Sequence, residues 1–99
     1  MATKTDTLWS RYLLHIANGA TQLEIGNAVG TTQVTISRWL TKGLVPTSAP
    51  VVATVARAYG RNPLEAFVAA GMLNEDEAGR GLDNDSRELL AGLRSLAHG

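Results

Sequence analysis

Apolar residues recur along this chain at the spacing of helix faces, and glycine or proline interrupts the pattern between segments. Within the first 73 residues the pattern predicts short helices at residues 7–18, 21–30, 32–42, 48–60 and 62–71. A further helix is expected from about residue 85 to residue 97. Because no segment alternates apolar and polar residues as a half-buried strand does, the predicted fold class is all-α.

Helix start and stop signals support these boundaries. Glu24 follows Thr21 by three residues, the pattern of a capping box in which each side chain accepts a hydrogen bond from a backbone N–H. Asn62 precedes Pro63, which combines an N-cap residue with a proline at the first helical position. Gly30 permits the left-handed conformation of a tight turn, so the second and third helices are expected to cross closely.

One side of each predicted helix is apolar and is expected to form the core. The residues expected to point inward are Leu8, Trp9, Tyr12, Leu13, Ile16, Ala17, Ile25, Ala28, Val29, Ile36, Trp39, Leu40, Val52, Val55, Ala56, Tyr59, Leu64, Phe67 and Val68. A close crossing of the second and third helices requires a small residue at the crossing point, and Gly26 provides it.

The composition changes after residue 73. Residues 74–85 are rich in acidic residues, asparagine and glycine, which predicts a solvated connector with one helical turn at residues 75–78. The chain is therefore divided into a helical domain (1–73), an acidic connector (74–85) and a C-terminal amphipathic helix (86–99).

The leucines of the C-terminal helix leave two alternatives open. Leu89, Leu93 and Leu96 lie on one stripe of that helix. The stripe is expected either to contact a second copy in a homodimer or to fold back over the preceding five helices. The acidic connector before it favours a mobile arm and hence the homodimer.

Composition excludes several classes of function. The chain is 44% hydrophobic and 18% charged, which is typical of a globular domain. It has no cysteine and two histidines, so thiolate nucleophiles and histidine-rich metal centres are excluded, and no cofactor is expected. No serine–histidine–acid set or phosphate-binding loop is present, so no enzymatic activity is expected. Neither a membrane span nor a secretory signal is seen, and a cytoplasmic location is expected.

The charges are divided unequally along the chain, although the formal net charge is zero. Residues 1–72 carry six basic side chains against three acidic ones, whereas residues 73–99 carry three against six. A cationic body with an acidic C-terminal segment is compatible with binding to phosphates, even though its field is weak.

The predicted helix at residues 32–42 has a short, polar outward face. At 100° per residue, the side opposite its apolar stripe carries Gln33, Val34, Ser37, Arg38 and Thr41. Such a mixture of hydrogen-bond donors and acceptors suits contacts with base edges in a DNA major groove. The start of the helix, with Thr32, would present backbone N–H groups to phosphate.

The segment from residue 21 to residue 39 reads Thr-Gln-x-x-Ile…Gly-Thr-Thr-Gln-Val-Thr-Ile-Ser-Arg-Trp. Through this motif, residues 5–73 resemble the lambda-repressor-like (Xre/Cro-type) helix-turn-helix domain. Residues 50–67 are similar to the fourth and fifth helices of that family. The segment Leu-Glu-Ala-Phe-Val-Ala-Ala-Gly is similar to a segment of short immunity repressors of temperate phages and related actinobacterial regulators.

The resemblance implies a five-helix fold and a set of DNA-contacting residues. Gln22 would contact phosphate and support Gln33, while the residues after Gln33 would read bases. The DNA-binding residues expected here are Gln22, Thr32, Gln33, Val34, Thr35, Ser37, Arg38, Thr41 and Lys42. The sequence departs from the family where Gly26 replaces the usual alanine and Leu40 replaces a frequent glutamate.

The expected function is that of a sequence-specific transcriptional regulator, a repressor of the phage immunity type, bound to a double-stranded DNA operator. It would act in the cytoplasm of a bacterial host, associated with the nucleoid when bound. The alternative is an antitoxin-like regulator that binds a toxin protein through its C-terminal segment as well as its own promoter.

Overall fold

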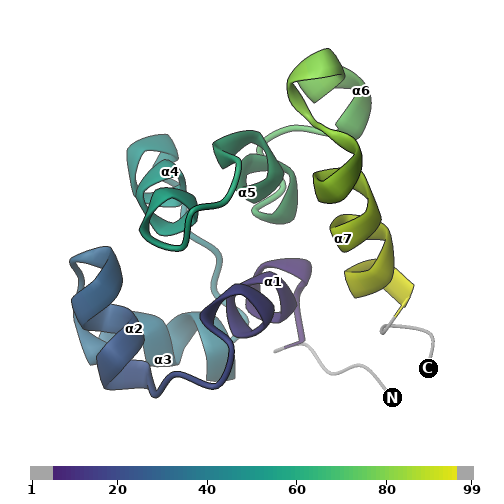
Figure 1. The fold of residues 1–99 in the computed structure, drawn as a ribbon. Helices are drawn as coiled ribbons and strands as arrows, with labels where there is room; N and C mark the ends of the chain where they lie inside the picture. The colour runs from purple at the N-terminus through teal and green to yellow at the C-terminus, as the bar shows by residue number, and fades with distance from the viewer. Residues whose placement is uncertain (1–5, 96–99) are drawn as a thin grey trace.

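Capping residues divide residues 6–95, the part that the computed structural model describes, into seven α-helices and one 3₁₀ turn (Figure 1). The elements in chain order are α1 (Leu8–Ala17), α2 (Gln22–Val29), α3 (Gln33–Thr41), α4 (Ala49–Ala58), α5 (Pro63–Ala69), α6 (Glu75–Ala78), η1 (Gly79–Gly81) and α7 (Asn84–Ser95). These residues contain no strand, so the all-α prediction is confirmed for them.

The capping hydrogen bonds predicted at Thr21 and Asn62 both form. The Thr21 side chain accepts a hydrogen bond from the Glu24 N–H (3.1 Å), and the Glu24 carboxylate accepts one from the Thr21 N–H (2.9 Å). The hydrogen bond from the Thr21 N–H to the carboxylate lowers the pKa of Glu24 below its usual value. Asn62 caps α5 through the Leu64 N–H. Ser48 occupies the N-cap position of α4, but its side chain makes no capping hydrogen bond.

The core is centred on α1, which lies between the α2–α3 pair and α7 (Figure 1). Trp9 of α1 is fully buried, and its ring meets the Trp39 ring of α3 edge to face, with centroids 5.6 Å apart. Most residues predicted to point inward are buried. Ala28 is exposed, however, and six of the predicted residues are only half-buried: Leu8, Ile16, Leu40, Tyr59, Leu64 and Phe67.

The C-terminal helix folds back over the other helices. Helix α7 packs against α1 and α5, and Leu90 and Leu93 are buried in the common core. The prediction that Leu93 contacts a second copy is therefore wrong for this fold, because its own chain covers it. Leu89 is half-buried against the same core, and Leu96 lies outside the described residues.

The predicted connector is likewise part of the folded body. Leu82, at the end of η1, is 2% exposed and belongs to the core cluster. A solvated arm would leave such a side chain in water, so the prediction of a mobile arm is wrong for this segment. The predicted single turn at residues 75–78 is confirmed as α6.

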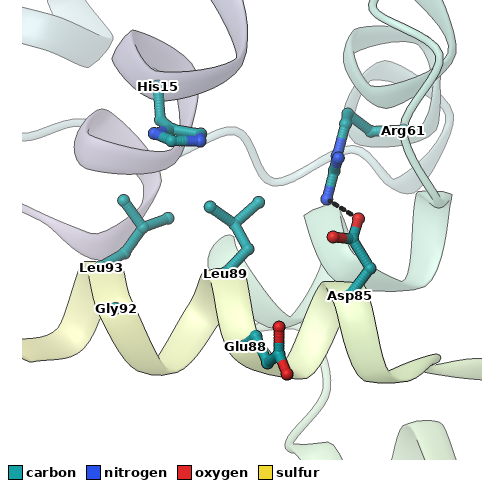
Figure 2. Close-up of a pocket in the computed structure, with 7 residues that line it drawn as sticks. All are labelled: His15, Arg61, Asp85, Glu88, Leu89, Gly92 and Leu93. Atoms are coloured by element: carbon teal, nitrogen blue, oxygen red, sulfur yellow. Dashed lines mark ion pairs between the residues drawn. The ribbon is translucent and has the colours of Figure 1, made fainter.

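A buried carboxylate joins α5 to α7. Glu65 of α5 is fully buried, although a glutamate at the third helical position usually faces solvent. Arg61 donates two hydrogen bonds to it, at 2.9 and 2.6 Å, and the Ser86 hydroxyl of α7 donates a third at 2.8 Å. Arg61 also pairs with Asp85 of α7 at 3.0 Å (Figure 2). The charge inside the protein is thus paired and hydrogen-bonded, as a stable buried charge requires.

The same contacts determine the ionisation of the buried groups. Burial by itself raises the pKa of Glu65, but the hydrogen bonds from Arg61 and Ser86 outweigh that effect and lower the pKa below its usual value. Burial, together with the neighbouring Glu65 charge, raises the pKa of Tyr12 far above its usual value. Glu65 is therefore charged and Tyr12 neutral at pH 7.

These contacts predict that stability falls in acid. Because the folded-state pKa of Glu65 is depressed, its contribution is complete above about pH 5 and is lost as the pH falls through that pKa. We expect Glu65→Gln to lower the free energy of unfolding at pH 7 by about 1–3 kcal/mol. The difference between the two proteins should shrink toward pH 3. Urea unfolding from pH 7 to pH 3 measures this, and parallel pH profiles would contradict the assignment.

Candidate nucleic-acid interface

Helices α2 and α3 meet through a tight turn. The Gly26 carbonyl accepts hydrogen bonds from the N–H groups of Gly30 and Thr31, the latter at 2.9 Å, and Gly30 has a φ of 76°. A Cβ added at Gly26 would lie 3.0 Å from the Thr31 carbonyl oxygen and 3.3 Å from the Gln33 nitrogen. The backbone of α2 therefore touches the start of α3, as predicted, and glycine is the residue that allows this contact.

The burial pattern of α3 fixes which of its sides faces outward. Ile36 and Trp39 are buried in the core, and Trp39 is held there against Trp9. At 100° per residue, Val34 lies opposite these two residues, at the centre of the outward face. Its side chain is 59% exposed. The outward face is therefore the one that the sequence predicted.

Six of the nine predicted DNA-binding residues line one shallow hollow of about 360 Å³. They are Gln22, Gln33, Val34, Ser37, Arg38 and Lys42. The first belongs to the start of α2, the next four to α3, and the last caps the end of α3. The hollow thus brings two amides, two cations, one hydroxyl and one apolar side chain to a single surface.

The other three predicted residues are threonines whose hydroxyls serve the helix itself. Thr32 Oγ1 accepts a hydrogen bond from the Thr35 N–H (3.1 Å), which caps α3, and it also lies 3.1 Å from Thr35 Oγ1. Thr41 Oγ1 donates to the Ser37 carbonyl at 2.7 Å. These threonines do not line the hollow. Because their hydroxyls are hydrogen-bonded within α3, they are less available to a ligand than the side chains that line the hollow.

The charge of this surface is modestly positive. Arg38 and Lys42 are exposed, and neither takes part in an ion pair within residues 6–95. Glu24 on α2 is engaged by its capping box. Two unneutralised cations beside two amides can hold a phosphate and donate to base edges, whereas the hollow offers no titratable pair for acid–base chemistry.

A second hollow of about 470 Å³ lies between α1, the loop that precedes α5, and α7 (Figure 2). Leu89 and Leu93 of α7 point toward His15 of α1, and the Arg61–Asp85 pair closes one end. This hollow exists only because α7 docks on α1 and α5, so sequence reasoning missed it. Within residues 6–95, no three histidine, cysteine or acidic side chains come close enough to hold a metal ion.

Comparison of the chain with protein-family models, with curated proteins and with solved structures found no match. Among the described residues, no helix combines the length and apolar character needed to cross a bilayer.

The close contact at Gly26 can be tested with a matched pair of alanine substitutions. Gly92 lies within α7, and a Cβ added there meets nothing within 4 Å, so Gly92→Ala should stabilise the protein by up to about 1 kcal/mol. Gly26→Ala gains the same helix propensity but pushes against the α3 backbone. We expect its free energy of unfolding to be at least about 1 kcal/mol below that of Gly92→Ala in urea titrations. Equal stabilisation by both substitutions would contradict the close crossing.

Proposed function

We propose that the protein is a sequence-specific double-stranded DNA-binding transcriptional regulator, and that α1–α5 form a lambda-repressor-like helix-turn-helix domain. The observation that carries the proposal is the hollow lined by α2 and α3, because it gathers on one outward surface two amides and two cations that make no ion pair within residues 6–95. The tight turn at Gly30, the close backbone contact at Gly26 and the burial of Ile36 and Trp39 support it by holding α3 in one orientation.

In this proposal α3 enters the major groove, which at about 12 Å wide admits one α-helix. Gln33, Ser37 and Arg38 contact base edges, for which amide, hydroxyl and guanidinium groups are suited donors and acceptors. Gln22, at the start of α2, and Lys42, at the end of α3, hold the phosphates on either side. Repression follows when the occupied site overlaps a promoter and excludes the polymerase.

The antitoxin alternative receives less support. It needs a C-terminal segment that is free to bind a toxin, whereas α7 is packed against α1 and α5 and is tied to the buried Glu65 through Ser86. The DNA-binding proposal does not require α7 to be free. It uses only side chains that are already exposed or lie in an open hollow.

The proposal predicts that the protein enriches a defined sequence from a random double-stranded DNA library. At about 150 mM salt, weak non-specific binding to phosphates is suppressed, so sequencing of the bound pool reports base readout. A two-fold symmetric motif would mean that two copies bind, and an asymmetric motif would mean one. Failure to enrich any motif would overturn the proposal.

Substitutions within the hollow separate recognition from folding. Gln33→Ala or Arg38→Ala should weaken binding to the enriched site by about 1–3 kcal/mol, because each removes a base contact. Both side chains are exposed, so the free energy of unfolding should change by less than about 0.5 kcal/mol. Fluorescence anisotropy and urea unfolding measure the two effects. Arg57→Ala, an exposed arginine on α4 outside the hollow, is the matched control and should retain affinity.

A further inference from the structure

Val34 is an apolar residue at the centre of an otherwise polar surface. It is 59% exposed, the highest value among the exposed large hydrophobic side chains of the described residues. The other side chains that line its hollow are Gln22, Gln33, Ser37, Arg38 and Lys42, all of which are polar or charged.

Neither packing nor helix formation accounts for a valine at this position. The core side of α3 is occupied by Ile36 and Trp39, and Val34 points away from both. A branched side chain also lowers helix propensity relative to the straight-chain residues that are favoured on exposed helix surfaces. Its placement is accounted for if a partner brings an apolar group to the middle of the hollow.

We propose that Val34 contacts the C5-methyl group of one thymine and so selects a T·A pair at that position of the DNA site. This inference rests on the proposed function. The C5-methyl of thymine is the one apolar substituent that the bases project into the major groove; apart from the flat C5–H edge of cytosine, the features beside it are hydrogen-bond donors and acceptors. A valine cannot form a hydrogen bond, so the methyl group is the base feature that it recognises.

The neighbouring side chains restrict where this thymine lies. Gln33 precedes Val34 at the start of α3, and Ser37 and Arg38 follow within about one helical turn. The methyl contact is therefore surrounded by hydrogen-bonding groups that read the flanking bases. In this proposal Val34 provides selectivity at one base pair of the DNA site, and its polar neighbours provide selectivity at the adjacent base pairs.

Deoxyuridine substitution tests this contact directly. Deoxyuridine pairs as thymine does and lacks only the C5-methyl group. Starting from the enriched DNA site, each thymine is replaced in turn by deoxyuridine, and dissociation constants are measured by fluorescence anisotropy. We expect one replacement to weaken binding of the unsubstituted protein about three- to fivefold, the effect of burying one methyl group.

Protein variants identify the side chain responsible. Val34→Ala should bind the thymine and deoxyuridine sites with equal affinity, whereas Val34→Thr, which keeps one methyl group, should retain part of the preference. Leu14→Ala is the matched control, because Leu14 is 56% exposed on α1 and lies outside the hollow; it should keep the full preference. Thermal unfolding checks that each variant is folded.

Three results would overturn the inference, and they distinguish its failure from that of the proposed function. If a DNA motif is enriched but no deoxyuridine weakens binding, or if Val34→Ala keeps the full preference, the thymine contact is wrong and the proposed function stands. If no motif is enriched, the proposed function fails and the thymine contact fails with it.

Discussion

The contact between the α2 backbone at Gly26 and the start of α3 is the constraint on which the outward surface depends. With no Cβ at residue 26, the turn after Gly30 brings the two helices into direct backbone contact. Trp39 then meets Trp9 edge to face and fixes the rotation of α3 about its axis. Because α3 is held at its N-terminal end and along its buried side, its outward face has a single orientation relative to the rest of the protein. The backbone that carries this face is therefore already in place before any contact is made.

The helices up to residue 69 and the polar face of α3 could be predicted because their signals are local. A capping box such as Thr21 with Glu24 requires only residues three apart, and the buried stripe of α3 repeats within one turn. Gln33 and Arg38 could be placed on the outward face for the same reason. The hollow that joins Gln22 to them also follows from a local unit, since α2 and α3 are separated by only three residues.

The position of α7 and the role of Glu65 could not be predicted because they depend on contacts distant in sequence. An amphipathic stripe shows that one face of a helix will be buried, but it does not show which surface will cover that face. The pattern around Leu93 is therefore compatible both with a dimer contact and with packing against the same chain. Glu65 has the sequence signal of an ordinary helix start, and its burial requires Ser86, which lies 21 residues further along. The composition of the connector favours solvent, because Leu82 is its single large apolar residue, and the burial of Leu82 depends on the helices around it.

The docking of α7 also decides how charge is distributed in space. Helices α6 and α7, which belong to the acid-rich end of the chain, lie on the far side of α1 and α5 from α2 and α3 (Figure 1). A neutral molecule with separated charges has an electric dipole, here with its positive end toward Arg38 and Lys42. Near a polyanion the field exerts a torque on this dipole, which turns α3 toward the polyanion and the acidic helices away. A protein without net charge can thus be oriented before contact while its non-specific attraction stays weak.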